Sequence, residues 1–292
     1  MKRVLAIIAL LTLATATATA DDGKPPSSTG LSVFANAGGF WASKNNAGFY
    51  SGRPGNANTI DRILHSNTYG TQIWNNLVSQ GLISPSAIGS YDQLQVAEYP
   101  EMYYRTSYQV GLGIRYDYAG GMGWLLRFDL AHLQALGAFN ISSANGAGIL
   151  GSDQYIRCGM MGKEDRINID LAMTYRIPLT ANLEFEVDLG ACLVNSKVKD
   201  NVMEIGGATY SILDIWGGRT PDAGVGSYEY INQGGIGYGV FMSALVGYRI
   251  QGLGAMRLGY TCYQTRTVLE GYSGWGWQHM LGIRIEMNNF NI

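Results

Sequence analysis

Two neighbouring segments of this chain alternate strictly between apolar and polar residues over ten or more positions each. The stretch 164–194 reads EDRINIDLAMTYRIPLTANLEFEVDLGACLV, and the alternation holds on both sides of a turn of five or six residues. A side-chain period of two indicates β-strands with one apolar face and one polar face. Ordinary strands run about five or six residues, whereas a tilted strand needs about ten to cross a bilayer. The strand length therefore indicates a membrane-spanning sheet.

The same alternation recurs in six further segments, which brings the predicted count to eight strands. The predicted strands are Gly30–Trp41, Tyr104–Tyr118, Trp124–Phe139, Ile167–Ile177, Leu183–Leu193, Gly235–Ile250, Met256–Thr265 and Trp275–Met287. The connections are short at 119–123, 178–182 and 251–255, and long at 42–103, 140–165, 195–234 and 266–274. This layout predicts an all-β, antiparallel, up-and-down transmembrane barrel with short periplasmic turns and long extracellular loops.

Two of the long loops carry patterns of their own. In the first loop, apolar residues recur at steps of three and four, which predicts an amphipathic helix lying over the barrel mouth or presenting a face to a partner. These residues are Ile60, Ile63, Leu64, Ile73, Trp74, Leu77 and Val78. In the third loop, Val202–Leu213 contains Gly206-Gly207, a strong two-residue turn signal, which predicts an external hairpin. If that hairpin instead prolongs neighbouring strands, a ten-strand count is the alternative.

The N-terminus predicts export from the cytoplasm. Residues 1–20 combine Lys2 and Arg3, a short apolar run and a small-residue cleavage site, which is typical of a signal peptide. Residues 21–29 are then a periplasmic segment, and residues 30–292 form the barrel domain. Charged residues are 14% of the chain, against about 25% in ordinary soluble domains. The net charge of −2 and the lack of a basic run argue against nucleic-acid binding.

The direction in which the two faces point follows from glycine and aromatic residues. Glycine is frequent on the polar face, where small residues relieve crowding inside a narrow barrel. Tyrosine and tryptophan gather at the ends of the apolar runs, as expected for interfacial girdles facing lipid. We therefore predict that the apolar face meets lipid. The predicted girdle is Tyr116, Tyr118, Trp124, Tyr175 and Tyr248 by the short turns, and Trp41, Tyr108 and Trp277 at the other ends.

The polar face then carries many charges into the lumen. Unpaired charges in so narrow a space are costly, so we expect arginines and carboxylates to pair and to fill the barrel, leaving no wide pore. The predicted lumen charge network is Arg115, Asp117, Arg127, Asp129, Asp170, Arg176, Glu184, Glu186, Asp188, Arg249, Arg257, Arg284 and Glu286.

No catalytic, cofactor or metal site is predicted. The three histidines, His65, His132 and His279, lack a nucleophile at suitable spacing and a recognised set of metal ligands. His132 and His279 share the parity of lipid-facing residues near the outer rim, so a lipid-modifying enzyme stays a remote alternative. Three cysteines leave two interpretations open. Cys158 and Cys192 form a disulfide at one rim, or all three thiols, including Cys262, are free.

In layout, residues 30–288 resemble the small outer-membrane barrels of the OmpA and OmpX type, although no diagnostic motif carries the resemblance. Such barrels commonly end in an aromatic residue, whereas this sequence ends Phe290-Asn291-Ile292. The resemblance implies a monomer in contact with outer-membrane lipid. The expected role is structural or one of surface interaction, with any protein partner bound by the loops at 42–103 and 195–234. A component of a secretion or surface-assembly machine is the alternative.

Overall fold

A computed structural model describes residues 30–144, 148–150, 154–213, 233–250 and 254–287. The predicted signal peptide, the segment 21–29 and the terminal Phe290 lie outside these residues. The barrel and long strands are β1 (Gly30–Trp41), β4 (Ser107–Asp117), β5 (Met122–Ser143), β6 (Ile156–Pro178), β7 (Leu183–Ile205), β9 (Gly235–Ile250), β10 (Gly254–Leu269) and β11 (Tyr272–Met287). The short strands are β2 (Leu94–Glu98), β3 (Tyr103–Tyr104) and β8 (Ala208–Ser211).

Within the described part of the chain, the helices all lie before β5 in the sequence. They are α2 (Lys44–Ala47), α3 (Ile60–Leu64) and α4 (Tyr69–Ser79), with the 3₁₀ helices η1 (Gly48–Ser51), η2 (Tyr91–Gln93) and η3 (Ala119–Gly121). No helix among the described residues is long and apolar enough to cross a membrane.

Eight antiparallel strands close into a ring. Hydrogen-bonded neighbours follow the order β1-β4-β5-β6-β7-β9-β10-β11, and β11 pairs back with β1. The predicted eight-stranded, up-and-down barrel is therefore confirmed. The ten-strand alternative is wrong, because β8 pairs with β7 beyond the ring and adds no strand to it.

The strand register sets the tilt of the barrel. A walk from Trp41 through cross-strand partners passes His279, Cys262, Met242, Leu189, Met173, Trp124 and Tyr116, and it returns to β1 at Leu31, ten residues earlier. With a strand rise of about 3.3 Å and a strand spacing of about 4.8 Å, this stagger over eight strands gives a tilt of about 40°. That value lies within the range of membrane barrels.

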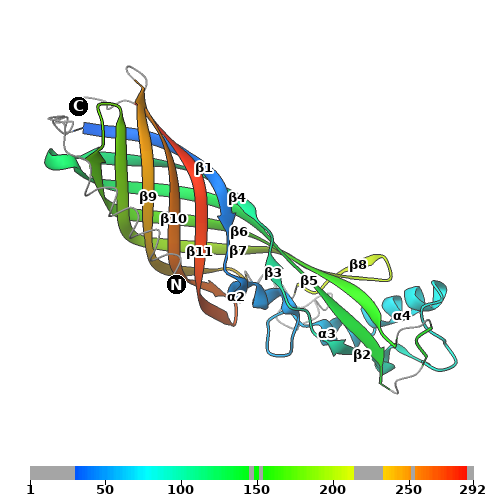
Figure 1. The fold of residues 1–292 in the computed structure, drawn as a ribbon. Coiled ribbons are helices and arrows are strands. Elements are labelled where there is room, and N and C mark those ends of the chain that lie inside the picture. The colour runs from blue at the N-terminus through cyan, green and yellow to red at the C-terminus, as the bar shows by residue number, and fades with distance from the viewer. Residues whose placement is uncertain (1–29, 145–147, 151–153, 214–232, 251–253, 288–292) are drawn as a thin grey trace, which may run out of the picture.

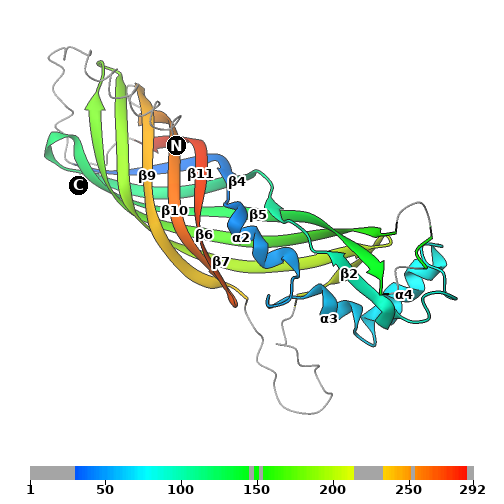
Figure 2. The ribbon, with the colours of Figure 1, turned by 60° about the horizontal axis from the view of Figure 1, so that its bottom comes forward.

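Three strands continue far beyond the ring. β5, β6 and β7 contain 22, 23 and 23 residues, against 11 to 16 in the other five ring strands. Their outer ends form a sheet with β2, β3 and β8, and Figure 1 shows it projecting from one end of the barrel. The helices α2, α3 and α4 follow one another along one face of this sheet (Figure 2). We call this sheet and its helices the extension.

The extension corrects several loop predictions. The predicted loop 140–165 is mostly strand, because β5 runs to Ser143 and β6 begins at Ile156. The predicted loop 195–234 begins as strand up to Ile205, and the predicted loop 266–274 shrinks to a tight turn at Glu270-Gly271. The Gly206-Gly207 hairpin is confirmed, and both glycines adopt the positive φ values that such a turn requires, 55° and 69°.

The helix prediction for the first loop is correct in type and only partly correct in place. Helices α3 and α4 cover Ile60–Leu64 and Tyr69–Ser79. They pack on the sheet of the extension and do not lie over the barrel mouth. The mouth is covered instead by α2 and η1, whose short turns contact β11 and β6. The extension therefore has an apolar core of its own, in which Leu64, Ile73 and Leu77 meet Phe139 and Met203.

Candidate functional site

The outer wall of the ring is an apolar belt bounded by aromatic residues. Leu112, Leu171 and Leu258 are more than half exposed, although they lie in the middle of long strands. Tyr238 and Tyr248 mark the two ends of the belt on β9, and at the tilt given above they lie about 25 Å apart along the barrel axis. This height matches the hydrocarbon band of outer-membrane barrels.

The predicted girdle residues point outward at these two levels. Seven of them expose 40% to 61% of their surface, and Tyr118 is partly exposed. At the lower level Tyr116 pairs across strands with Trp124, and Met122 beside it pairs with Tyr175. At the upper level Trp41 pairs with His279. Tyr238 and Trp275, which the sequence reasoning did not single out, add an edge-to-face contact at 5.8 Å between ring centroids.

The lumen near the short turns holds the densest part of the charge network. Five arginines face five carboxylates there, and nine of these ten side chains are almost fully buried. Glu186 is the centre: it lies 2.6 Å from Arg115, 2.9 Å from Arg176 and 3.1 Å from Arg257, and it also pairs with Arg284. The remaining members are Asp117, Glu184, Asp188, Arg249 and Glu286.

A second cluster fills the middle of the barrel. Arg127 lies 2.9 Å from Asp129 and 2.5 Å from Asp170, and its guanidinium stands 5.3 Å from the centroid of the Phe241 ring. Asn36 donates to Asp129 at 2.8 Å. A cavity of about 20 Å³ beside Arg127 and Arg284 has room for about one water molecule. The interior at this level is filled by side chains.

The third cluster lies at the mouth and joins the barrel to α2 and η1, which we call the cap. Glu164 pairs with Arg166, which also donates to Gln278 at 2.7 Å. From η1, the Tyr50 hydroxyl donates to Glu164 at 2.7 Å, and the Tyr104 hydroxyl donates to the same carboxylate at 3.0 Å. Sequence reasoning missed Arg166 and Glu164, although both share the parity of Asn168 and Asp170 and could have been found by extending that pattern.

Tyr50 is the side chain that plugs the mouth. It is fully buried, and its ring occupies the space directly above Gly162, where a Cβ would lie 2.1 Å from the ring. Burial, and then the charge of Glu164, raises the pKa of Tyr50 well above its usual range, so the hydroxyl stays a neutral donor. Asn46 of α2 adds a hydrogen bond to Thr267 at 2.8 Å. The cap is therefore fixed to the barrel by specific polar contacts.

The cysteines and histidines are not members of these ion clusters. All three cysteines are free, and the predicted alternative of a Cys158–Cys192 disulfide is wrong. Cys158 lies in the extension core, whereas Cys192 pairs across strands with Asp170 in the barrel, roughly 40 Å away along β6. His132 contacts Asp165 at 2.5 Å, His279 contacts the Tyr260 hydroxyl at 2.6 Å, and His65 contacts its own helix backbone. His132 and His279 lie on non-adjacent strands.

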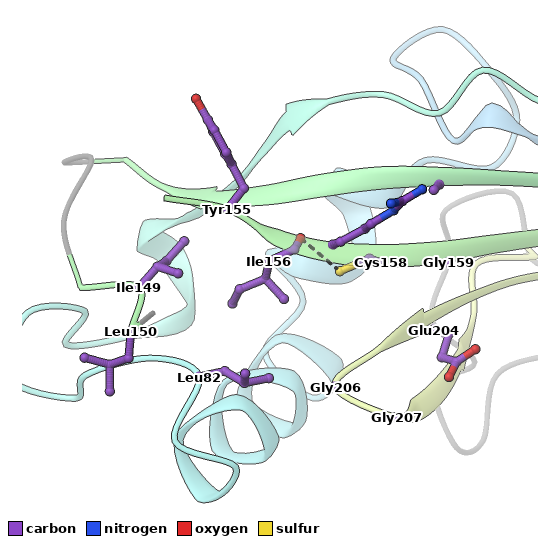
Figure 3. Close-up of a pocket in the computed structure, with 12 residues that line it drawn as sticks. Leu82, Ile149, Leu150, Tyr155, Ile156, Cys158, Gly159, Glu204, Gly206 and Gly207 are labelled. Carbon is purple, nitrogen blue, oxygen red and sulfur yellow. Dashed lines mark hydrogen bonds between the residues drawn. The ribbon is translucent and has the colours of Figure 1, made fainter. Parts of the chain in front are cut away.

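The extension carries two adjoining hollows near its outer end. One, of about 560 Å³, opens between the end of β6 and the β7–β8 hairpin, and its lining includes Leu82, Ile156 and Glu204 (Figure 3). The other, of about 440 Å³, lies against the face of the sheet away from the helices. They meet because the β6–β7 ladder ends at Gly159 and Glu204, where β7 turns back into β8. Both hollows are lined by Ala138, Arg157, Gly159 and Glu204.

Comparison with known proteins finds remote structural likeness only. No protein-family model matches the chain, and no curated protein matches it. Two solved structures of Ail, the attachment invasion locus protein of Yersinia pestis, are similar at 8% sequence identity, with a TM-score of 0.33. Each alignment covers 89% of this chain and 99% of Ail, and one of the two structures contains the heparin analogue sucrose octasulfate. The assignment as an eight-stranded barrel rests on the hydrogen-bonded ring described above.

Proposed function

We propose that this chain is a monomeric outer-membrane barrel that is sealed along its axis and carries the extension at the cell surface for interaction with other molecules. The observation that carries the proposal is the inversion of polarity along β6. Below the mouth its outward residues are apolar and its inward residues are ionic. Beyond the mouth Lys163 and Arg157 point outward, while Met160 and Ile156 are buried under the helices. Such an inversion fits one strand passing from lipid into water.

The lumen network supports a sealing role. The predicted network residues, together with Arg166 and Glu164, fill the cross-section at three levels, and Tyr50 covers the mouth. An interior of eight strands has little space beyond its side chains. We therefore propose that the barrel acts as an anchor and that recognition belongs to the extension, in keeping with the tendency of loops on a rigid scaffold to carry function. Residues 1–20 would direct export, and residues 30–292 would form one domain.

Three measurements test this proposal. The folded chain should migrate differently in detergent gels before and after boiling, because closed barrels resist detergent until heated. Planar bilayers containing it should lack conductance of porin size. On intact cells, an Arg157→Cys variant should react with a membrane-impermeant maleimide in a Cys158→Ser, Cys192→Ser, Cys262→Ser background. If the variant were labelled in broken cells but not on intact cells, the extension would lie on the periplasmic side of the membrane.

Two other roles would be recognised by different results. A stoichiometric partner recovered in mild detergent would favour a component of a secretion or surface-assembly machine. Release of acyl chains from radiolabelled phospholipid, lost in His279→Ala, would favour a lipid-modifying enzyme. Within the present proposal His279 stays an interfacial side chain held by the Tyr260 hydroxyl, with a polar tip near the upper girdle.

A further inference from the structure

The two faces of the extension sheet differ in what covers them. The inner face packs against the helices and forms the extension core with Phe139, Cys158 and Met203. No helix among the described residues packs on the outer face. Its rows of side chains change in polarity and size with distance from the barrel. Leu136, Met161 and Val202 form an apolar row, and the next row consists of Ala138, Gly159 and Glu204. The small residues of that second row leave the 440 Å³ hollow.

Two charged side chains of the hollow, Arg157 and Glu204, have no partner among the described residues, whereas Glu101 at its edge pairs with Lys44. Arg157 and Glu204 are exposed, both line the hollow, and neither makes a side-chain hydrogen bond or ion pair to another described residue. They flank Gly159, whose missing Cβ would lie 3.6 Å from the Cβ of Glu204, an ordinary contact distance. Tyr103, 52% exposed, supplies an aromatic ring at the side formed by β3. The hollow thus offers a donor, an acceptor and apolar walls at once.

These features restrict the class of ligand. A volume of about 440 Å³ suits a small molecule or a few units of a polymer. Gly159 lies about 26 Å along β6 beyond Ile167 of the apolar belt, so hydrocarbon chains do not reach it. A purely apolar ligand would strip water from Arg157 and Glu204 without replacing its hydrogen bonds. A polyanion would be repelled by Glu101 and Glu204, which both line the hollow.

We propose that this outer-face hollow binds an uncharged oligosaccharide. A hydroxyl both donates and accepts, so neighbouring hydroxyls of one sugar satisfy the donors of Arg157 and the acceptors of Glu204 together. The apolar face of a pyranose ring packs against Tyr103, Leu136 and Met161. The proposal rests on the proposed function, because it places the hollow outside the membrane and names the ligand class of the extension.

The test uses the full chain folded in detergent and three immobilised probes: maltotetraose, cellotetraose and chitotetraose. At least one should bind with a dissociation constant below about 1 mM. For that probe, Arg157→Ala and Glu204→Gln should each weaken binding about tenfold or more, because each removes a charged hydrogen-bonding group. Gly159→Phe should abolish binding by filling the hollow while leaving thermal stability intact. Lys197→Ala, on the same outer face but outside the hollow, is the matched control and should bind like the wild type.

Three results would overturn the proposal. The first is that no probe binds, and the second is that binding is unchanged in both Arg157→Ala and Glu204→Gln. The third is that a basic peptide or heparin binds in place of the sugars and that Gly159→Phe blocks this binding. Gel mobility before and after boiling, measured on the same preparations, separates this outcome from failure of the proposed function. A chain that binds sugar without forming a heat-modifiable barrel would contradict the anchor and support the hollow, whereas a stable barrel without sugar binding would do the reverse.

Discussion

The barrel lumen and the extension core share the strands β5, β6 and β7 but are filled by opposite kinds of side chain. On β6 the inward positions within the barrel are Arg166, Asn168 and Asp170, whereas the inward positions beyond it are Ile156, Cys158 and Met160. The outward positions change in the reverse sense, from Leu171 and Ile167 to Lys163 and Arg157. One strand thus carries two hydrophobic patterns of opposite phase, and the change of phase marks the barrel mouth.

The difference shows that the surroundings, and not the strand, determine which face is apolar. With the barrel in the outer membrane as proposed, lipid solvates the outer face within the belt, so the interior has no hydrophobic driving force of its own and is filled by paired ions. Beyond the mouth water solvates the outer face, and an apolar core under the helices becomes favourable. The two regions should therefore fail differently when a central side chain is removed.

The largest effect is expected in the lumen. Glu186→Ala leaves Arg115, Arg176, Arg257 and Arg284 short of their shared carboxylate in a buried site. Removing one member of a buried ion cluster typically costs about 3–5 kcal/mol, because charge is left uncompensated. Urea unfolding in phospholipid vesicles, followed by tryptophan fluorescence, would measure it. The control is Glu101→Ala, whose partner Lys44 is 66% exposed, and there the change should stay within about 1 kcal/mol. Equal effects at the two sites would contradict the sealed, ion-filled lumen.

A substitution that creates a cavity in the extension core should destabilise the extension and leave the barrel unchanged. Leu77 is fully buried on α4, and Leu77→Ala should cost about 3 kcal/mol through lost contacts and an unfilled cavity. We expect the helices of the extension to exchange amide hydrogens faster, while the strands within the barrel keep their protection and the gel mobility shift is retained. Asn75→Ala, at an exposed position of the same helix, should leave exchange unchanged. Faster exchange throughout the barrel strands would indicate that the two regions unfold as one unit.

A smaller effect is expected where the regions meet. Gly162→Ala introduces a Cβ that would lie 2.1 Å from the ring of Tyr50, so the cap must shift and the Tyr50–Glu164 hydrogen bond is strained. Overpacking of this kind costs about 2 kcal/mol. Protease cleavage within 42–60 should accelerate, and the added cost should largely vanish when Tyr50→Ala is already present. Additive effects of the two substitutions would show that Tyr50 does not occupy the space above Gly162.

The sequence predicted the barrel well because its rules are strict there. Period-two alternation placed β1 and β9 at their observed bounds, and the parity of Arg115 and Glu186 placed them inward. The extension was missed because the apolar and polar residues of β6 exchange faces near Lys163. A segment in which the period-two pattern changes phase was interpreted as a loop. The shared carboxylate of Glu186 and the plug of Tyr50 depend on register between distant strands, which a single sequence does not contain. The Cys158–Cys192 alternative failed because β6 begins at Ile156 and not at the predicted Ile167. Cys158 therefore lies in the extension, twelve residues along β6 from Asp170, the partner of Cys192.

The last prediction concerns the reactivity of Cys158, whose measurement is expected to disturb the fold least. It tests most directly whether the inward face of β6 is apolar beyond the mouth. Burial, and then the charge of Glu204, raises the pKa of this thiol to about 12, whereas a free cysteine titrates near 8.5. At pH 8 only about one thiol in ten thousand is ionised, and raising the pH to 9 leaves that fraction near one in a thousand. In a Cys192→Ser, Cys262→Ser background, maleimide labelling should therefore be slow across this range and become fast after boiling in detergent. The matched probe is Lys197→Cys with Cys158→Ser, an outward position on β7 that should label quickly in the folded protein. Rapid labelling of Cys158 at pH 8 would mean that the inward face of β6 beyond the mouth is in contact with water. The change of hydrophobic pattern along β6 could then not be explained by an apolar core in the extension.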